Sequence, residues 1–427
     1  MALARRKAPT TTLRFALSNA LSLLGNSVAA VVLPLVLLAR TGDALAAGTL
    51  ALVCAVPQML VGLLGGALLD RVNRRNVSIV SDLVSAASVA LLPIVDMVWG
   101  LSFGWFVALG LLGAIGDIPG MTARDTLLPA VVSRDGIDLQ RFLGVSQSLE
   151  SLVTIVGPAL AAVLIGFAGD ASALWVTAAL SCAAALVTLT LPRAVGRTGN
   201  EGKVAASAPG GQARGVIAAA RASLRDGVRV LFRDDELLRS SMLLSFGIIM
   251  VMGSFQGLVL PVHFTEAGRP ELLGYVLSAM SAGLLAGSLG YTALAPRLRK
   301  RAWFVASLLG MATGVAIMGL LPGYPVLLAG AVVLGVSAGP ASALMGFFAF
   351  DRIPEANRGS ALGTQNALVL VVAPVAVFLT SAVVEAAGAS VGALALVGCW
   401  LMVTAWALAT RSLRKMDEKA PSAAEGA

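Results

Sequence analysis

The chain has 427 residues, of which 57% are hydrophobic and only 13% are charged. This composition excludes an ordinary soluble multidomain protein, because there are too few charged side chains to cover the surface of one. The net charge is +8, but the basic residues recur in small clusters along the whole chain, which argues against nucleic-acid binding.

Twelve long apolar stretches follow one another along the chain, separated by short charged connectors. An apolar helix of about 20 residues crosses the hydrocarbon core of a bilayer. We therefore expect an all-α integral membrane protein with 12 transmembrane helices near residues 14–38, 45–69, 77–95, 101–123, 140–168, 171–192, 240–264, 271–295, 302–321, 326–350, 359–384 and 388–410.

The basic residues lie on alternate connectors. Of the 31 Lys and Arg, all but Arg40 and Arg269 are expected on one side of the membrane, together with both tails. Because positive charge collects on the cytoplasmic side, we expect cytoplasmic N- and C-termini and contact with anionic membrane lipids. The abundance of Ala and the preference for Arg over Lys are typical of GC-rich bacteria, which indicates the bacterial cytoplasmic (inner) membrane.

The longest connector divides the chain into two halves. It starts with a small, polar stretch at 196–211, and its second part, 215–239, is basic and amphipathic at helical spacing, as in a helix that lies on a membrane surface. We expect four parts: an N-terminal six-helix bundle (1–192), a cytoplasmic linker with an amphipathic helix (193–239), a C-terminal six-helix bundle (240–410) and a cytoplasmic tail (411–427).

The two halves repeat short motifs in the same order. Val32-Leu33-Pro34 precedes a basic turn at 71–75, and Val259-Leu260-Pro261 precedes another at 297–301. Internal repeats of this kind are typical of secondary transporters, which bind their substrate near the bilayer midplane between the repeats. The sequence therefore predicts two pseudo-symmetric bundles.

The turn after the second stretch has a distinctive pattern, formed by Gly66, Asp70, Arg71, Asn73, Arg74 and Arg75. It resembles the signature loop of the major facilitator superfamily, which acts as a latch between the two halves. The resemblance implies that Asp70, Arg71, Arg74 and Arg75 stabilise the outward-facing state, with Asp125 and residues 359–360 as partners. The alternative is that the arginines only set the topology.

A second pattern lies in the fifth stretch, where Gly144 is followed by Gly157 and Pro158. It resembles the antiporter motif of the same superfamily, although Val153 replaces one expected glycine. The tract at 127–129 resembles the branch that includes macrolide-efflux and enterobactin-exporter proteins. The glycine and proline either bend the helix to seal the bilayer or simply permit close helix packing.

Ionisable side chains at membrane depth are costly and mark functional sites. Glu150 is the foremost candidate, because it lies ten residues into the fifth expected helix, about 15 Å deep. Gln147 and Thr154 share its helix face. We expect Glu150 to couple protons or bind a cationic substrate; the alternative is a structural hydrogen bond to another helix.

Asp117 is the second candidate for proton coupling, because the resemblance places the fourth helix on the central cavity. Asp82 and Asp96 lie closer to the ends of the third helix, from which they could reach water. Uncharged polar residues complete the expected substrate cavity: Asn19, Asn26, Gln147, Gln256 and Gln365. Each of these is also explained by a hydrogen bond between helices.

Other chemistries find little support. His263 is the only histidine, and Cys54, Cys182 and Cys399 are far apart, so we expect no catalytic residue, no metal site and no enzymatic activity. No phosphate-binding loop is present in the sequence. We therefore expect no cofactor, with the proton gradient as the energy source.

The sequence thus predicts a secondary transporter that works by alternating access and exports a small lipophilic or amphipathic compound, such as a drug or natural product, in exchange for protons. Its expected partners are this small-molecule substrate and membrane lipids, and we expect a functional monomer. An uptake symporter or facilitator for a nutrient or siderophore is the alternative. A lipid scramblase, a membrane-embedded enzyme and a non-transporting sensor are less well supported, since no matching site or soluble domain is recognisable.

Overall fold

The computed structural model describes residues 10–69, 72–197, 225–294, 299–353 and 358–410. Every regular element in these ranges is helical. Eleven helices are long and apolar enough to cross a membrane, and a shorter apolar helix covers Ala44–Met59. Together they account for the twelve predicted spans, in the predicted order.

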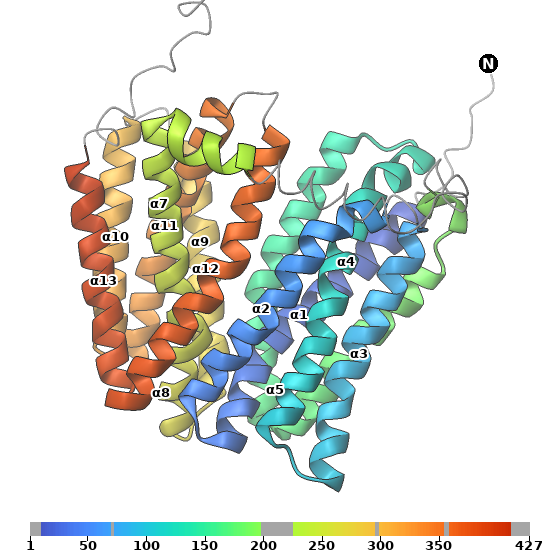
Figure 1. Cartoon of the computed structure of the whole chain (residues 1–427), viewed down its shortest axis with the longest axis horizontal. Coiled ribbons are helices and arrows are strands. Elements are labelled where there is room, and N and C mark those ends of the chain that lie inside the picture. The colour runs from blue at the N-terminus through green and yellow to red at the C-terminus, as the bar shows by residue number, and fades with distance from the viewer. Residues whose placement is uncertain (1–9, 70–71, 198–224, 295–298, 354–357, 411–427) are drawn as a thin grey trace, which may run out of the picture. The chain divides into compact units, whose positions relative to one another are not determined.

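The first compact unit contains residues 1–42 and 53–217. Its described elements, coloured blue to green in Figure 1, are α1 (Thr10–Thr41), most of α2 (Ala44–Leu69), α3 (Arg74–Val98), α4 (Phe103–Asp135), α5 (Leu139–Leu189) and the short helix η1 (Arg193–Gly196). Within this unit α1 packs along α5, and α3 packs against both α4 and α5.

The second unit contains residues 43–52 and 218–427. Its elements, coloured from yellow-green to red in Figure 1, are η2 (Val230–Asp234), α7 (Glu236–Ser254), η3 (Phe255–Val259), α8 (Leu260–Glu266), α9 (Leu272–Leu294), α10 (Lys300–Gly319), α11 (Tyr324–Arg352), α12 (Arg358–Ala387) and α13 (Ala389–Ala409). Here α11 packs against α9 and α10, while α13 packs against α7, α10 and α12.

Glycine separates two spans within α5. Gly169 has φ 76° and ψ 173°, a conformation that L side chains rarely adopt. The helix therefore breaks there, and the apolar segments Phe142–Phe167 and Ala171–Leu189 cross separately. Two of the predicted spans are thus joined with almost no loop.

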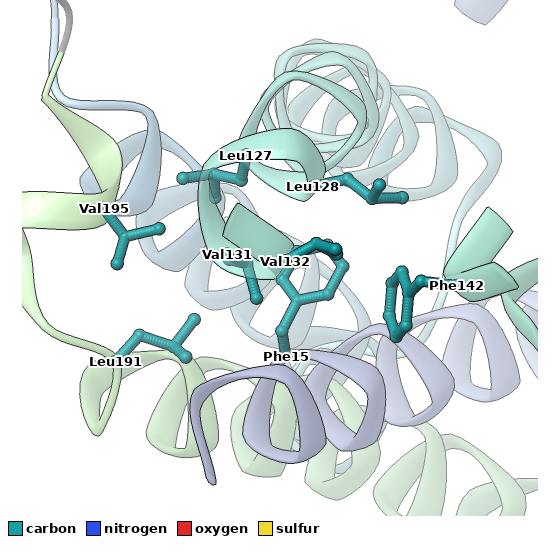
Figure 2. Close-up of a cluster of buried hydrophobic side chains, with 8 residues drawn as sticks. All are labelled: Phe15, Leu127, Leu128, Val131, Val132, Phe142, Leu191 and Val195. Atoms are coloured by element: carbon teal, nitrogen blue, oxygen red, sulfur yellow. The ribbon is translucent and has the colours of Figure 1, made fainter. Parts of the chain in front are cut away.

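The fourth span is longer than expected. The prediction ended it at residue 123, where the apolar run stops at Arg124 and Asp125, but α4 continues to Asp135. Its last turns are covered by other parts of the first unit rather than by lipid. Figure 2 shows Leu127, Leu128, Val131 and Val132 of α4 packed with Phe15, Phe142, Leu191 and Val195. Gly136, at φ 67°, ends the helix.

The described part of the central linker packs against protein. Residues 225–229 are helical and continue into η2, where Val230 and Leu231 are buried with Leu238, Met242 and Ile353. Asp235 then caps α7, since its Oδ1 accepts the Leu238 N–H at 2.8 Å. The sequence predicts an amphipathic helix on the membrane surface over 215–239. In the structure the apolar side chains of its last described turn pack inside the second unit instead. Residues 215–224 lie outside the described ranges.

Candidate functional site

A buried ion pair joins α3 and α4 in the first unit. Arg124 donates a hydrogen bond from Nη2 to Oδ1 of Asp82. The exposed fractions of the two side chains are only 8% and 3%. Asp82 lies eight residues after the start of α3, or about 12 Å along the helix axis. A charged pair at this depth is costly unless further hydrogen bonds satisfy both groups. Such pairs therefore often mark functional sites.

A third helix contributes to the same carboxylate. The Ser22 hydroxyl of α1 donates to Oδ1 of Asp82 at 2.9 Å. The other oxygen, Oδ2, and the Nε of Arg124 are buried and have no hydrogen-bond partner among the described residues. The cluster therefore has a free acceptor and a free donor, which buried polar groups seldom leave unused.

Asp117 adds a second acid to this cluster. It lies seven residues before Arg124 in α4, which is two helical turns and hence nearly the same helix face. Ser85 of α3, Arg124 and Asp82 are all close enough to act electrostatically on its carboxyl. The cluster thus has two carboxyls and one guanidinium, so it is neutral when it holds one proton and carries a charge of about −1 when it holds none.

Glu150, the first sequence candidate, does not belong to this cluster. Gln147, Glu150 and Thr154 all lie exposed on one face of α5, as the predicted polar stripe requires. The Thr154 hydroxyl donates to the backbone oxygen of Glu150 at 2.8 Å. The charge that acts on the Glu150 carboxylate is that of Asp125, on the exposed face of α4.

The predicted cavity residues are partly or fully exposed. Asn19 lies beside Phe142 and Ser146 of α5. Asn26 and Gln365 are half-buried on α1 and α12. Gln256 lies in η3, a π-helical turn within the span from Glu236 to Glu266. Such turns are frequent at functional sites, so Gln256 stays a candidate cavity residue.

The latch motif is only partly described. Asp70 and Arg71 lie outside the described residues, and Gly66 lies in α2. Arg74 donates from Nη1 to the backbone oxygen of Thr126 at 3.2 Å, and buried Arg75 donates to the backbone oxygen of Leu189, the last residue of α5. Cations favour the carbonyl end of a helix, so Arg75 stabilises the end of α5. The acceptor of Arg74 lies nine residues before the end of α4, so Arg74 ties the start of α3 to the interior of that helix.

Asn73, which precedes Arg74 in the latch motif, caps the start of α3. Its Oδ1 accepts the Arg75 N–H at 3.2 Å at the start of α3, and its Nδ2 donates to the backbone oxygen of Arg193 at 3.2 Å. The proposed partner Asp125 is exposed and lies ten residues before the end of α4, rather than just beyond the span that the sequence predicts to end at residue 123. The latch itself remains a prediction.

The two glycines of the antiporter-like motif differ. A Cβ at Gly157 would overlap the side chain of Ser27 on α1, whereas a Cβ at Gly144 would meet nothing within 4 Å. Pro158 is buried next to Gly157 in α5. Close packing of α1 on α5 therefore accounts for Gly157, and it does not account for Gly144.

Sequence reasoning missed the main partner in the cluster. The basic-connector pattern places Arg124 at the cytoplasmic end of the fourth span, and Asp82 lies where its side chain could reach water; in the structure both side chains are buried within helices. The signal was available in the seven-residue spacing between Asp117 and Arg124, which puts an acid and a base on one helix face. As for metals, no group of three possible ligands occurs in the described ranges.

Comparisons with known proteins agree with this architecture. A profile of the Major Facilitator Superfamily matches residues 15–268. The multidrug efflux pump Tap of Mycolicibacterium fortuitum is 30% identical, over 92% of this chain and 94% of its own length. The macrolide efflux protein A of Streptococcus pyogenes is 31% identical over 34% of this chain and 36% of its own.

A solved structure shows the same fold. The crystal structure of the nucleoside transporter NupG superposes with a TM-score of 0.72 at 14% identity, covering 96% of this chain and all of that one. Together with the twelve spans and the profile match over more than half of the sequence, these likenesses establish that the chain belongs to the major facilitator superfamily.

Proposed function

We propose that this protein is a proton-coupled efflux transporter for small lipophilic or amphipathic compounds, and that it acts by alternating access rather than as an enzyme. The relatives named as multidrug and macrolide efflux proteins support export.

The observation that carries the coupling is the acid excess of the cluster, in which Asp82 and Arg124 are buried and Asp117 is half-buried. Asp82 and Asp117 share a single base, Arg124. A proton on either acid removes the net charge from a site within the membrane, where net charge is costly. Proton binding and release would thus change the energy of the packing among α1, α3 and α4, which is how a proton gradient can bias one conformation.

The charge distribution supports the orientation and location. The only two basic residues expected outside, Arg40 and Arg269, each have an acidic partner: Asp96 lies 2.7 Å from Arg40, and Glu271 lies 3.8 Å from Arg269. The positive-inside rule counts Lys and Arg rather than net charge, and the other 29 of the 31 Lys and Arg are expected on the side of the two termini. We therefore place both termini in the cytoplasm of a bacterial cell. A monomer as the functional unit is a separate part of the proposal.

Dye and antibiotic accumulation in an efflux-deficient bacterium tests the proposal. Cells that express the wild type should accumulate less of at least one compound than cells with an empty vector, and a protonophore should abolish the difference. Asp117→Asn should abolish it too. The matched control is Asp96→Asn, which removes a carboxylate from the outer end of α3 and should leave export intact. Export that persists with the protonophore would contradict proton coupling.

A further inference from the structure

An apolar pocket lies within the second unit. It has a volume of about 170 Å³ and is formed by α7, α12 and α13. Its walls are almost entirely apolar, as Val251, Ala376 and Leu396 illustrate, and none of its lining residues is charged. Such a pocket selects a neutral, compact and largely apolar occupant.

One wall carries an unused hydrogen-bonding group. Ser254 lines the pocket, its side chain is 0% exposed, and its Oγ has no partner among the described residues. The other hydroxyl of the lining, Thr380 Oγ1, donates to the backbone oxygen of Ala376 at 2.8 Å. A buried hydroxyl without a partner is destabilising, so a ligand that bonds to Ser254 would relieve that cost.

The backbone next to Ser254 is irregular. The π-helical turn η3 begins at the following residue, Phe255. Turns of this type occur often at functional sites within helices. The irregular turn and the unpaired hydroxyl are therefore two separate signs of a ligand site on this span.

The mouth of the pocket is apolar as well. Leu379 and Val383 of α12 line it and are 56% and 37% exposed. The opposite face of α12 is covered by the start of α2, where Ala44 N–H donates to Glu385 at 3.2 Å and a Cβ at Gly48 would overlap Ser381. Leu379 and Val383 lie in the membrane-spanning part of α12, so this mouth opens at membrane depth.

Size narrows the ligand class. Engineered apolar cavities of about 150 Å³ bind benzene, so a pocket of about 170 Å³ accommodates one six-membered ring with small substituents. We propose that this pocket binds neutral monocyclic phenols and ring alcohols of similar size, with the ring among the apolar walls and the hydroxyl bonded to Ser254. This binding requires neither a proton gradient nor export, so it stands apart from the proposed function.

Photolabelling of the full chain in lipid nanodiscs tests the site. The probe is a phenol with a diazirine on its ring, and adducts are located by mass spectrometry. We expect adducts on α12 and α13 near Thr380 and Cys399, which line the pocket. 4-Ethylphenol should displace the probe at about fivefold lower concentration than ethylbenzene, because one net hydrogen bond is worth roughly that factor.

Variants isolate the hydroxyl and the pocket. Ser254→Ala should bring the two competitors to equal potency. Ser307→Ala is the matched control, since it also removes a buried hydroxyl without a partner among the described residues, but on α10 and outside the lining; it should preserve the fivefold difference. Ala395→Leu, at an exposed lining position of α13, should reduce labelling without a change in the core.

Two results would overturn the proposal. The first is equal competition by both compounds in the wild type, which would mean that the pocket holds any apolar group, including a lipid acyl chain. The second is labelling spread over the apolar surface with no competition, which would mean that no site exists.

Discussion

Arg124 of α4 donates to the same carboxylate oxygen of Asp82 that accepts the hydroxyl of Ser22. A single oxygen thus joins α1, α3 and α4 inside the membrane-spanning part of the first unit. The arrangement links the stability of this unit to its charge state, because each partner is buried and depends on the others.

Removal of the base alone should destabilise the protein. Arg124→Gln leaves Asp82 buried without its counter-charge, and breaking a buried pair costs about 3–5 kcal/mol. We expect a lower midpoint for thermal unfolding of the purified protein in detergent. The double variant Asp82→Asn/Arg124→Gln should recover part of the loss, because it removes both charges. A double variant as unstable as the single one would show that the charge imbalance is not the cause.

This pair marks the limit of what the sequence predicts. The number, order and approximate bounds of the spans follow from apolar length alone, because the bilayer fixes that length. Hydropathy ends the fourth span before Arg124, whereas protein contacts to Phe15 and Phe142 carry α4 to Asp135. A hydropathy window measures only local apolar content, so it does not predict a helix whose last turns are buried by other parts of the protein.

The pairing itself was also beyond the sequence. Asp82 and Arg124 are 42 positions apart, and their contact depends on how α3 crosses α4. By contrast, the exposed stripe of Gln147, Glu150 and Thr154 on α5 agrees with the predicted helical spacing, since residues three and four apart share a face. Local periodicity is therefore readable, whereas the choice of partner helix is not.

The end of α4 caps the start of α1. Asp135 Oδ2 accepts both the backbone N–H of Thr12, at 2.7 Å, and its hydroxyl, at 2.9 Å. Asp135→Asn should weaken both bonds and cost about 1 kcal/mol, as for other helix caps. Hydrogen exchange should become faster over the first turns of α1. Glu271→Gln, in the ion pair with exposed Arg269, should leave that exchange unchanged; the idea fails if α1 exchanges equally in both variants.

The two motif glycines offer a matched comparison. Gly157→Ala should destabilise the protein by about 1–3 kcal/mol, since the added methyl group forces α1 and α5 apart at Ser27. Gly144→Ala should be neutral or stabilising by up to about 1 kcal/mol, because its surroundings are open and Ala favours a helix. Thermal unfolding measures both. Equal losses would mean that the motif acts through something other than close packing.

The two proton-coupling candidates make different predictions in proteoliposomes. Asp117→Asn removes one acid, so the cluster stays neutral as it is when it holds one proton. Substrate should still exchange down its own gradient. An imposed pH gradient should no longer drive substrate accumulation. Glu150 lies on an exposed face, under the influence of Asp125. If Glu150 instead binds a cationic substrate, Glu150→Gln should weaken exchange of cations about tenfold and leave neutral substrates coupled to protons.

Paired assays on the same vesicles separate these roles. Accumulation driven by a pH gradient reports coupling, whereas exchange without a gradient reports substrate binding and movement. Loss of driven accumulation with intact exchange in Asp117→Asn alone would assign coupling to the buried cluster. The same pattern in Glu150→Gln alone would move coupling to the exposed stripe. The excess of the two acids Asp82 and Asp117 over the single base Arg124 would then be a structural feature of the bundle.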